Sequence, residues 1–284
     1  MIPLDPPAMT VKETLTAACR RLRNSVLKIR LLDRERDLSA AEEIYIDAAK
    51  HNGLYTLAIA AQKAEELLPD RDGAHLRNLY SAGLVGRKDG RLKYDEIKAR
   101  APFGRCLLCG NSEIGSLDHH LPKDTLPLYT ICPVNLVPAC GKCNQMKGDR
   151  IGATGDQRTL HPYYDRPGQT GRYLFADIAS WPVQFRIQAL PEWDAELHAR
   201  VEYHFHTFKL AQRYAEFCIS VVTANQWLHQ KIRRESGVPA LTAHLQEDAE
   251  QHASTHGVNA WDTALRYGLA NSAWYLHQGV FESP

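Results

Sequence analysis

Residues 106–120 read "CLLCGNSEIGSLDHH", and residues 135–147 read "NLVPACGKCNQMK". Each stretch holds two cysteines with two residues between them, and thirty residues separate the two pairs. Four thiolates with this spacing are typical of a closed, tetrahedral zinc site, in which no ligand position stays open for chemistry. We therefore predict a structural Zn²⁺ site formed by Cys106, Cys109, Cys140 and Cys143.

The composition of the whole chain is that of an ordinary soluble globular protein. Of the 284 residues, 44% are hydrophobic and 24% are charged, and the net charge is only +1, so overall charge gives no argument for nucleic-acid binding. The segment from Arg87 to Arg105, however, contains seven basic residues and only three acidic ones. Such a segment suits a phosphate backbone or, equally, a solvated surface of mixed sign.

The location expected from the sequence is the cytoplasm. The start "MIPLDPPAMTVKE" lacks the basic and apolar regions of a secretory signal, and no apolar run is long enough to span a membrane. The paired cysteines fit a metal site in a reducing compartment better than a disulfide framework.

The periodicity of apolar residues predicts a mainly α (α+β) fold. Residues 10–68 read as helical, with a capping box at Thr10 and Glu13 and an apolar stripe over 15–29. A second stripe over 210–232 predicts a long helix that stops at Gly237, and "VQFRIQAL" (183–190) reads as a strand that pairs with "HARVEYHF" (198–205). We expect three regions: an N-terminal helical region (1–99), a zinc-bound domain (100–166), and a C-terminal region with a hairpin and helices (167–284).

A series of polar residues lies between the two cysteine pairs and directly after the second pair. Asp118 and His119 precede "HLP", Asn135 precedes Leu136, and Asn144 follows the last cysteine, with Lys147 one turn later. These elements, in this order across 106–150, resemble the HNH nuclease family, in the form that carries a four-cysteine zinc site around a ββα-metal fold. One slot departs from the family pattern, because His120 stands where an apolar residue is usual.

The resemblance implies a role for each of these residues. Asp118 and Asn144 would bind a catalytic ion, and their hard oxygen ligands favour Mg²⁺ or Mn²⁺. His119 would be the general base that activates water, and Asn135 would hold the His119 backbone in place by hydrogen bonds across the loop. Lys147 would contact the phosphate of the scissile strand.

Two further histidines are candidates for substrate binding. His120 follows the expected base on a strand whose side chains alternate between faces, so only one of the two histidines reaches the metal, and the motif favours His119. The segment "LHPYYD" (160–165) contains His161, which either supports the site, contacts phosphate or belongs to a capped turn that closes the domain. Similar segments follow the motif in some bacterial HNH proteins, including components of anti-phage defence systems such as Septu, where the nuclease works with an ATPase.

The resemblance therefore implies a metal-dependent HNH endonuclease, a hydrolase of DNA phosphodiester bonds that acts in antiviral defence. No Gly-x-x-x-x-Gly-Lys-Ser/Thr phosphate loop occurs in the chain, so any nucleotide energy would come from an ATPase partner subunit. One site per chain would nick a duplex, so cutting both strands would require a homo-oligomer or two sequential cuts, and the sequence leaves this choice open. The alternative is a zinc-stabilised module that binds nucleic acid or protein without catalysis. DNA against RNA, the strandedness of the substrate and any sequence specificity stay open.

Overall fold

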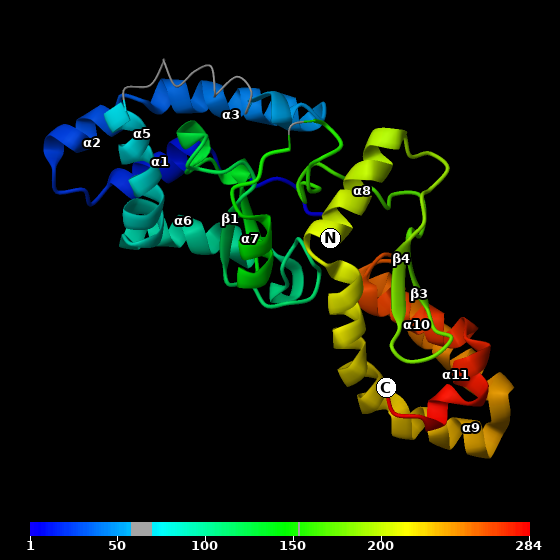
Figure 1. Cartoon of the computed structure of the whole chain (residues 1–284). Coiled ribbons are helices and arrows are strands. Elements are labelled where there is room, and N and C mark those ends of the chain that lie inside the picture. The colour runs from blue at the N-terminus through cyan, green and yellow to red at the C-terminus, as the bar shows by residue number, and fades with distance from the viewer. Residues whose placement is uncertain (58–69, 153) are drawn as a thin grey trace. The chain divides into compact units, whose positions relative to one another are not determined.

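A computed structural model describes residues 1–57, 70–152 and 154–284 of the chain. Its residues form two compact units, Met1–Asp165 and Arg166–Pro284. The predicted mainly α (α+β) fold is confirmed, because short two-stranded hairpins are set among many helices (Figure 1). The predicted regions 1–99 and 100–166 do not form separate units, because they share a hydrophobic core.

The first unit begins with helices and ends with a hairpin followed by a short helix. Its helices are α1 (Val11–Cys19), α2 (Ser25–Leu32), α3 (Glu35–Lys50), α5 (Asp70–Asn78), the π-helix η1 (Leu79–Val85) and α6 (Lys88–Ala99). There follow 3₁₀ turns η2 (Pro102–Gly104), η3 (Pro127–Tyr129) and η4 (Pro133–Asn135), strands β1 (Ser116–His119) and β2 (Leu136–Ala139), and helix α7 (Gly141–Lys147).

The start of α1 lies where the sequence predicts it. The carboxylate of Glu13 accepts a hydrogen bond from the backbone N–H of Thr10 at 2.9 Å. The carboxylate of Glu42, a residue of α3, accepts one from the N–H of Val11 at 3.0 Å. Two acids thus satisfy donors that a helix leaves unpaired at its first turn.

The predicted continuous stripe over 15–29 is wrong. Asn24 accepts a hydrogen bond from the N–H of Leu27 at 3.0 Å and starts α2 as a separate helix. The new helix buries Leu31 in the core but turns two residues of the predicted stripe outward, so Val26 is 76% exposed and Ile29 is 61% exposed. The predicted helical segment over 54–68 lies mostly outside the described residues.

The hairpin β1–β2 presents two different faces to the rest of the unit. The strands are antiparallel, and the register pairs Ser116 with Ala139 and His119 with Leu136. Alternate side chains of β1 point to opposite faces. Ser116 and Asp118 face α7, whereas Leu117 joins a buried cluster with Tyr94 and Ile97 of α6 and with three other residues, Met9, Leu84 and Leu136.

The larger core of the first unit joins the N-terminal helices to the loop between β1 and β2. Tyr45 of α3 and Leu15 of α1 belong to the same buried cluster as Leu121, Leu126 and Ile131 of that loop. The loop is therefore fixed by helices that lie roughly 75 to 115 residues earlier in the sequence.

The second unit places helices against a small hairpin. It consists of β3 (Leu174–Asp177), β4 (Gln184–Ile187), α8 (Ala195–Thr207), α9 (Leu210–His256), α10 (Trp261–Asn271), α11 (Ala273–His277) and the 3₁₀ turn η5 (Gly279–Phe281). Strands β3 and β4 pair antiparallel, α10 packs on β3, and α9 packs on β4 (Figure 1).

The strand predicted over 198–205 is wrong, because this segment belongs to α8. Asp194 accepts a hydrogen bond from the N–H of Leu197 at 2.7 Å and starts the helix. The buried residues Val201, His204 and Phe205 follow at helical spacing, so the short alternating pattern belongs to one helix face. Strand β4 pairs instead with the preceding segment.

The predicted stop at Gly237 is confirmed as an interruption within α9. The backbone there has φ 80° and ψ −174°, which lies outside helical geometry. Glycine adopts a positive φ without the steric cost that a Cβ imposes, and the helix resumes after it.

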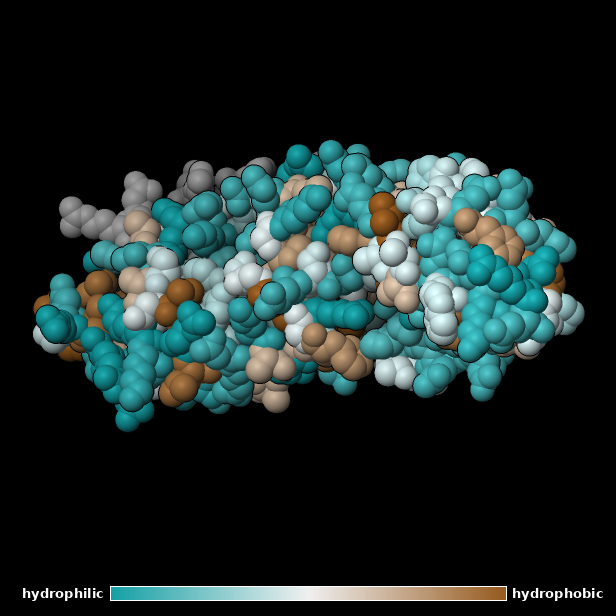
Figure 2. All heavy atoms as spheres, turned by 90° about the horizontal axis from the view of Figure 1, so that it is seen from below, coloured by the Kyte–Doolittle hydropathy of each residue, from teal (hydrophilic) through white to brown (hydrophobic). Residues whose placement is uncertain are grey.

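The surface carries its large apolar residues in separate places. Figure 2 shows a face on which hydrophilic residues predominate and apolar ones form small patches. In the basic segment, Arg91 pairs with Asp95 at 2.9 Å and Lys93 pairs with Glu96 at 3.0 Å, so local acids pair with two of its seven basic residues. Within the part of the chain that the structure describes, none of the helices is long and apolar enough to cross a membrane.

Candidate metal centre and active site

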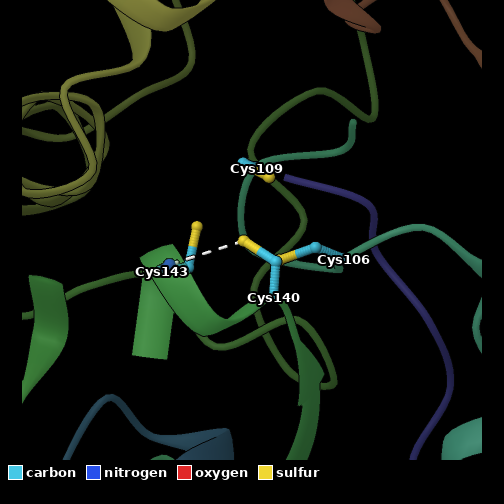
Figure 3. Close-up of side chains that lie close together, drawn as sticks. All are labelled: Cys106, Cys109, Cys140 and Cys143. Carbon is cyan, nitrogen blue, oxygen red and sulfur yellow. Dashed lines mark hydrogen bonds between the residues drawn. The ribbon is translucent and has the colours of Figure 1, made fainter. Parts of the chain in front are cut away.

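The four predicted zinc ligands come together in one buried cluster. The sulfur atoms of Cys106, Cys109, Cys140 and Cys143 all lie within 4.8 Å of one another (Figure 3). A tetrahedron with Zn–S bonds of about 2.3 Å has sulfur atoms about 3.8 Å apart. Four buried cysteines this close together can hold a metal ion such as zinc.

Local backbone structure brings each pair of sulfur atoms to the same side. The N–H of Cys106 donates to Ser112 O at 2.8 Å, and the N–H of Gly110 donates to Cys106 O at 2.8 Å. Gly110 has φ 71°, which lets the chain turn back after the first pair. In the second pair, Cys140 caps α7, and its sulfur accepts a hydrogen bond from the N–H of Cys143 at 3.4 Å (Figure 3).

Asp118 lies on the face of β1 that packs against α7, and it forms an ion pair with a buried lysine of that helix. The ammonium of Lys147 lies 3.2 Å from Oδ2 of Asp118 and donates to the carbonyl oxygen of His119 at 2.7 Å. Both Asp118 and Lys147 are 4% exposed. Burial raises the pKa of Asp118 to about 6, against the lowering effect of Lys147. The sequence suggested that Lys147 contacts substrate, but its ammonium points inward to this carboxylate.

Asn144 lies on the same side of β1 as Asp118. Its Nδ2 donates to the hydroxyl oxygen of Ser116 at 3.1 Å, two residues before Asp118 on the strand. The donor set suits a small, hard divalent cation, because Asp118 supplies a carboxylate and Asn144 an amide oxygen. Among the described residues, Oδ2 of Asp118 accepts no hydrogen bond, and the ammonium of Lys147 is its nearby positive charge.

His119 lies on the opposite face of β1 in a fixed orientation. Its Nε2 lies 2.8 Å from the carbonyl oxygen of Thr130, and its ring packs edge-on against Tyr80 with centroids 4.5 Å apart. A carbonyl oxygen only accepts, so Nε2 carries the hydrogen and the neutral ring has its lone pair on Nδ1. Burial lowers the pKa of His119 to about 4, which keeps the imidazole neutral at pH 7.

Asn135 is fully buried and joins the two ends of the loop around His119. Its Nδ2 donates to Leu121 O and to Tyr129 O, both at 3.0 Å, and its Oδ1 accepts from the N–H of Leu121 at 2.7 Å. The sequence predicted bonds that hold the His119 backbone. In the structure the amide holds Leu121, two residues after His119, and Tyr129, next to its partner Thr130.

His120 and His161 lie side by side in the interior. Their ring centroids are 4.1 Å apart, and they are 7% and 1% exposed. His161 contacts Tyr45 through Nε2 at 3.0 Å, and its Nδ1 accepts from the N–H of Tyr163 at 3.1 Å. Substrate binding was one of the roles that the sequence allowed for each histidine, and the structure places both among buried side chains.

Two tyrosines of the site come from the N-terminal helices, and sequence reasoning missed them. Tyr80 of η1 packs on His119 and donates its hydroxyl hydrogen to Leu117 O at 2.9 Å. Tyr45 of α3 is completely buried and donates to Oδ1 of Asn135 at 3.1 Å. In the sequence each looks like an ordinary core residue of a helix, and no local pattern marks its contact with the hairpin loop.

Comparisons with known proteins give one relationship at low identity. The protein Ea31 of Escherichia phage lambda is 25% identical over 213 residues, which cover 69% of this chain and 72% of that protein. No protein-family model matches the chain. No solved structure matches it either. The name Ea31 describes no activity, so the chemistry has to be inferred from the site itself.

Proposed function

We propose that this chain is a metal-dependent endonuclease of the HNH type that hydrolyses phosphodiester bonds in DNA. The observation that carries the proposal is the protonation and hydrogen bonding of the His119 imidazole. A neutral imidazole, held through Nε2 and carrying its lone pair on Nδ1, stands on the strand that also carries Asp118. A hairpin and a short helix anchored by four cysteines hold both residues.

In the proposed reaction, Nδ1 of His119 takes a proton from a water molecule. The water oxygen forms a bond to the phosphorus atom while the bond from phosphorus to the 3′ oxygen breaks. The leaving 3′ oxygen takes a proton from solvent water, so the products carry a 5′ phosphate and a 3′ hydroxyl. Thr130 and Asn135 keep the imidazole aligned during proton transfer, because they fix one ring nitrogen and the loop that surrounds it.

Asp118 and Asn144 would hold the catalytic Mg²⁺ or Mn²⁺. When bound, such an ion stabilises negative charge on the phosphate and on the leaving oxygen. Because the ammonium of Lys147 lies 3.2 Å from the same carboxylate, Lys147 has to move or share Asp118 when the site is loaded. The second ion, held by the four cysteines, is proposed to be a structural Zn²⁺.

A role in bacterial antiviral defence, in the cytoplasm and together with an ATPase subunit, completes the proposal. Its support is the order of the motif residues and the absence of a phosphate-binding loop from the sequence. A homo-oligomer would supply a second site for cutting the other strand.

One observation favours a second candidate function. Asp118 is 4% exposed and already neutralised by Lys147, as expected of a zinc-stabilised module that binds nucleic acid or protein without catalysis. Such a module would bind DNA with the same affinity in Mg²⁺ and in EDTA and would leave it intact.

A plasmid-cleavage assay with the zinc-loaded protein separates the two candidates. We expect nicked or linear product in Mg²⁺ or Mn²⁺, none in EDTA, and at least a 100-fold loss in His119→Ala with the fold retained. His51→Ala, which removes an exposed histidine at the end of α3, should cleave as the wild type does. Full activity in His119→Ala would overturn the assignment of the base.

A further inference from the structure

A chain of hydrogen bonds links Asn135 to Tyr45 and His161 in the interior of the first unit. Oδ1 of Asn135 lies 3.1 Å from the hydroxyl of Tyr45, and that hydroxyl lies 3.0 Å from Nε2 of His161. All three side chains are at most 1% exposed. They come from α3, from the end of the hairpin loop and from the segment after α7, so the chain spans three separate parts of the sequence.

The direction of every hydrogen in this chain follows from its end points. Nδ1 of His161 accepts from the N–H of Tyr163 at 3.1 Å, so in the neutral ring Nε2 carries the hydrogen. Nε2 therefore donates to the hydroxyl oxygen of Tyr45. The tyrosine then donates its own hydrogen to Asn135, whose Oδ1 also accepts from Leu121 at 2.7 Å.

This arrangement permits only one orientation of the Asn135 amide. A flipped amide would turn its NH₂ group toward two donors, the hydroxyl of Tyr45 and the N–H of Leu121, and would leave buried donors without acceptors. In the observed orientation, Nδ2 donates to Tyr129 O at 3.0 Å. Tyr129 precedes Thr130, whose carbonyl oxygen receives the hydrogen of His119.

We infer that Tyr45 and His161 are positioning residues, which act through Asn135 to hold His119 in its Nε2–H tautomer. The inference rests on the proposed function in one respect, that His119 is the base. Neither residue touches the reacting atoms. Each acts by fixing the loop carbonyl that binds Nε2, which leaves Nδ1 as the nitrogen that takes the proton.

Imidazole nitrogen shifts test this inference without any need for activity. The zinc-loaded full chain, labelled with ¹⁵N-histidine, is recorded at pH 7.5, and the His119 signals are those lost in His119→Ala. We expect the Nε2–H tautomer in the wild type and a mixture of tautomers in Tyr45→Phe. Tyr164→Phe is the matched control, because that hydroxyl has no hydrogen-bond partner among the described residues and its ring packs against His161.

A second pair of variants separates positioning from packing. His161→Gln keeps an N–H donor for Tyr45 and should retain the wild-type tautomer, whereas His161→Leu removes the donor and should give a mixture. In the cleavage assay, Tyr45→Phe and His161→Leu should lower kcat about tenfold at unchanged KM, and His161→Gln should restore most of it.

The outcomes distinguish the two hypotheses. A wild-type protein that cleaves nothing but shows these tautomer shifts would refute cleavage by the chain alone and keep the positioning role. Unchanged His119 tautomers in both Tyr45→Phe and His161→Leu would overturn the inference, whatever the activity. Equal changes in Tyr164→Phe would also overturn it, because they would show a general effect of packing.

Discussion

At the scale of single residues, Asp118 and His119 are neighbours whose pKa values shift in opposite directions. Burial raises the pKa of Asp118 from 3.8 to about 6 and lowers that of His119 from 6.5 to about 4. Acidification from pH 6 toward pH 4 therefore stabilises the fold through Asp118, since the folded protein binds that proton more readily. Through His119 stability falls as the pH drops from 6.5 toward 4, because the unfolded chain takes up that proton first.

Replacing Asp118 removes its contribution to the pH dependence of stability and leaves that of His119. When the pH is lowered from 7 to 5, the free energy of unfolding of Asp118→Asn should fall by about 1–2 kcal/mol relative to that of the wild type. The reason is that the variant lacks the stabilising uptake of a proton by Asp118. Urea unfolding at both pH values measures this difference. Asp124→Asn, at an exposed aspartate in the following loop, should behave as the wild type does. Equal pH slopes for Asp118→Asn and the wild type would contradict the expected shifts.

The sequence predicted the types and order of the site residues but not all of their orientations. Asp118, His119 and Asn135 were recognisable because the motif fixes their spacing. The inward turn of Lys147 was not, since it depends on a counter-ion on another element and on burial of both charges. The same holds for His161, whose partner Tyr45 lies 116 residues away.

At the scale of elements, α7 depends on the cysteine cluster. It has seven residues, and an isolated helix of that length is not stable in water. Two of the four cysteines lie at its start, and two lie on the loop before β1. The cluster therefore fixes the helix that presents Asn144 and Lys147 to the strand.

Zinc loss should release this element. We expect Cys143→Ser to lower bound zinc from about one ion per chain to a small fraction and to lower the melting temperature of the first unit. Metal analysis and thermal unfolding measure both. Cys19→Ala, at a buried cysteine of α1 outside the cluster, should retain its zinc. Retention of zinc by Cys143→Ser would argue against the four-sulfur site.

Helix α6 approaches η1 so closely that one position requires glycine. A Cβ added at Gly90 would lie 2.2 Å from Gly83 O and 2.8 Å from the Cα of Leu84. We expect Gly90→Ala to destabilise the protein by about 2 kcal/mol or more, because backbone atoms have to move apart. Denaturant unfolding measures the change. Gly141→Ala, where a Cβ meets nothing within 4 Å, should leave stability nearly unchanged, and similar losses in both would disprove the close contact.

Element prediction succeeded where the local sequence determines structure and failed where pairing is long-range. The start of α1 at Thr10 and the interruption at Gly237 follow from capping and from backbone freedom. The partner of β4 does not, since the alternating pattern of 198–205 fits a strand as well as one face of a helix. The segment forms a helix because Val201 and Phe205, four residues apart, are then buried on the same face.

At the scale of the whole molecule, the segment that carries the four cysteines and the N-terminal helices form one unit. Their shared core predicts that residues 1–165 fold and bind zinc without residues 166–284. The purified fragment should unfold cooperatively with about one bound zinc ion per chain. A fragment of residues 100–166 should not, because it lacks α1 and α3. Independent folding of the shorter fragment would show that the shared core is dispensable.

The two-faced strand β1 has a consequence for how such a protein can change over generations. Its α7 face holds Asp118, and its other face holds His119 against Tyr80. Suppose that recombination moved only the cysteine-flanked segment (106–147), here called the cassette, into another protein. The transferred segment would contain all of the motif residues but would lack the N-terminal helices that pack against β1 and its loop. A transfer that keeps both faces of β1 covered would therefore have to include the N-terminal helices together with the cassette.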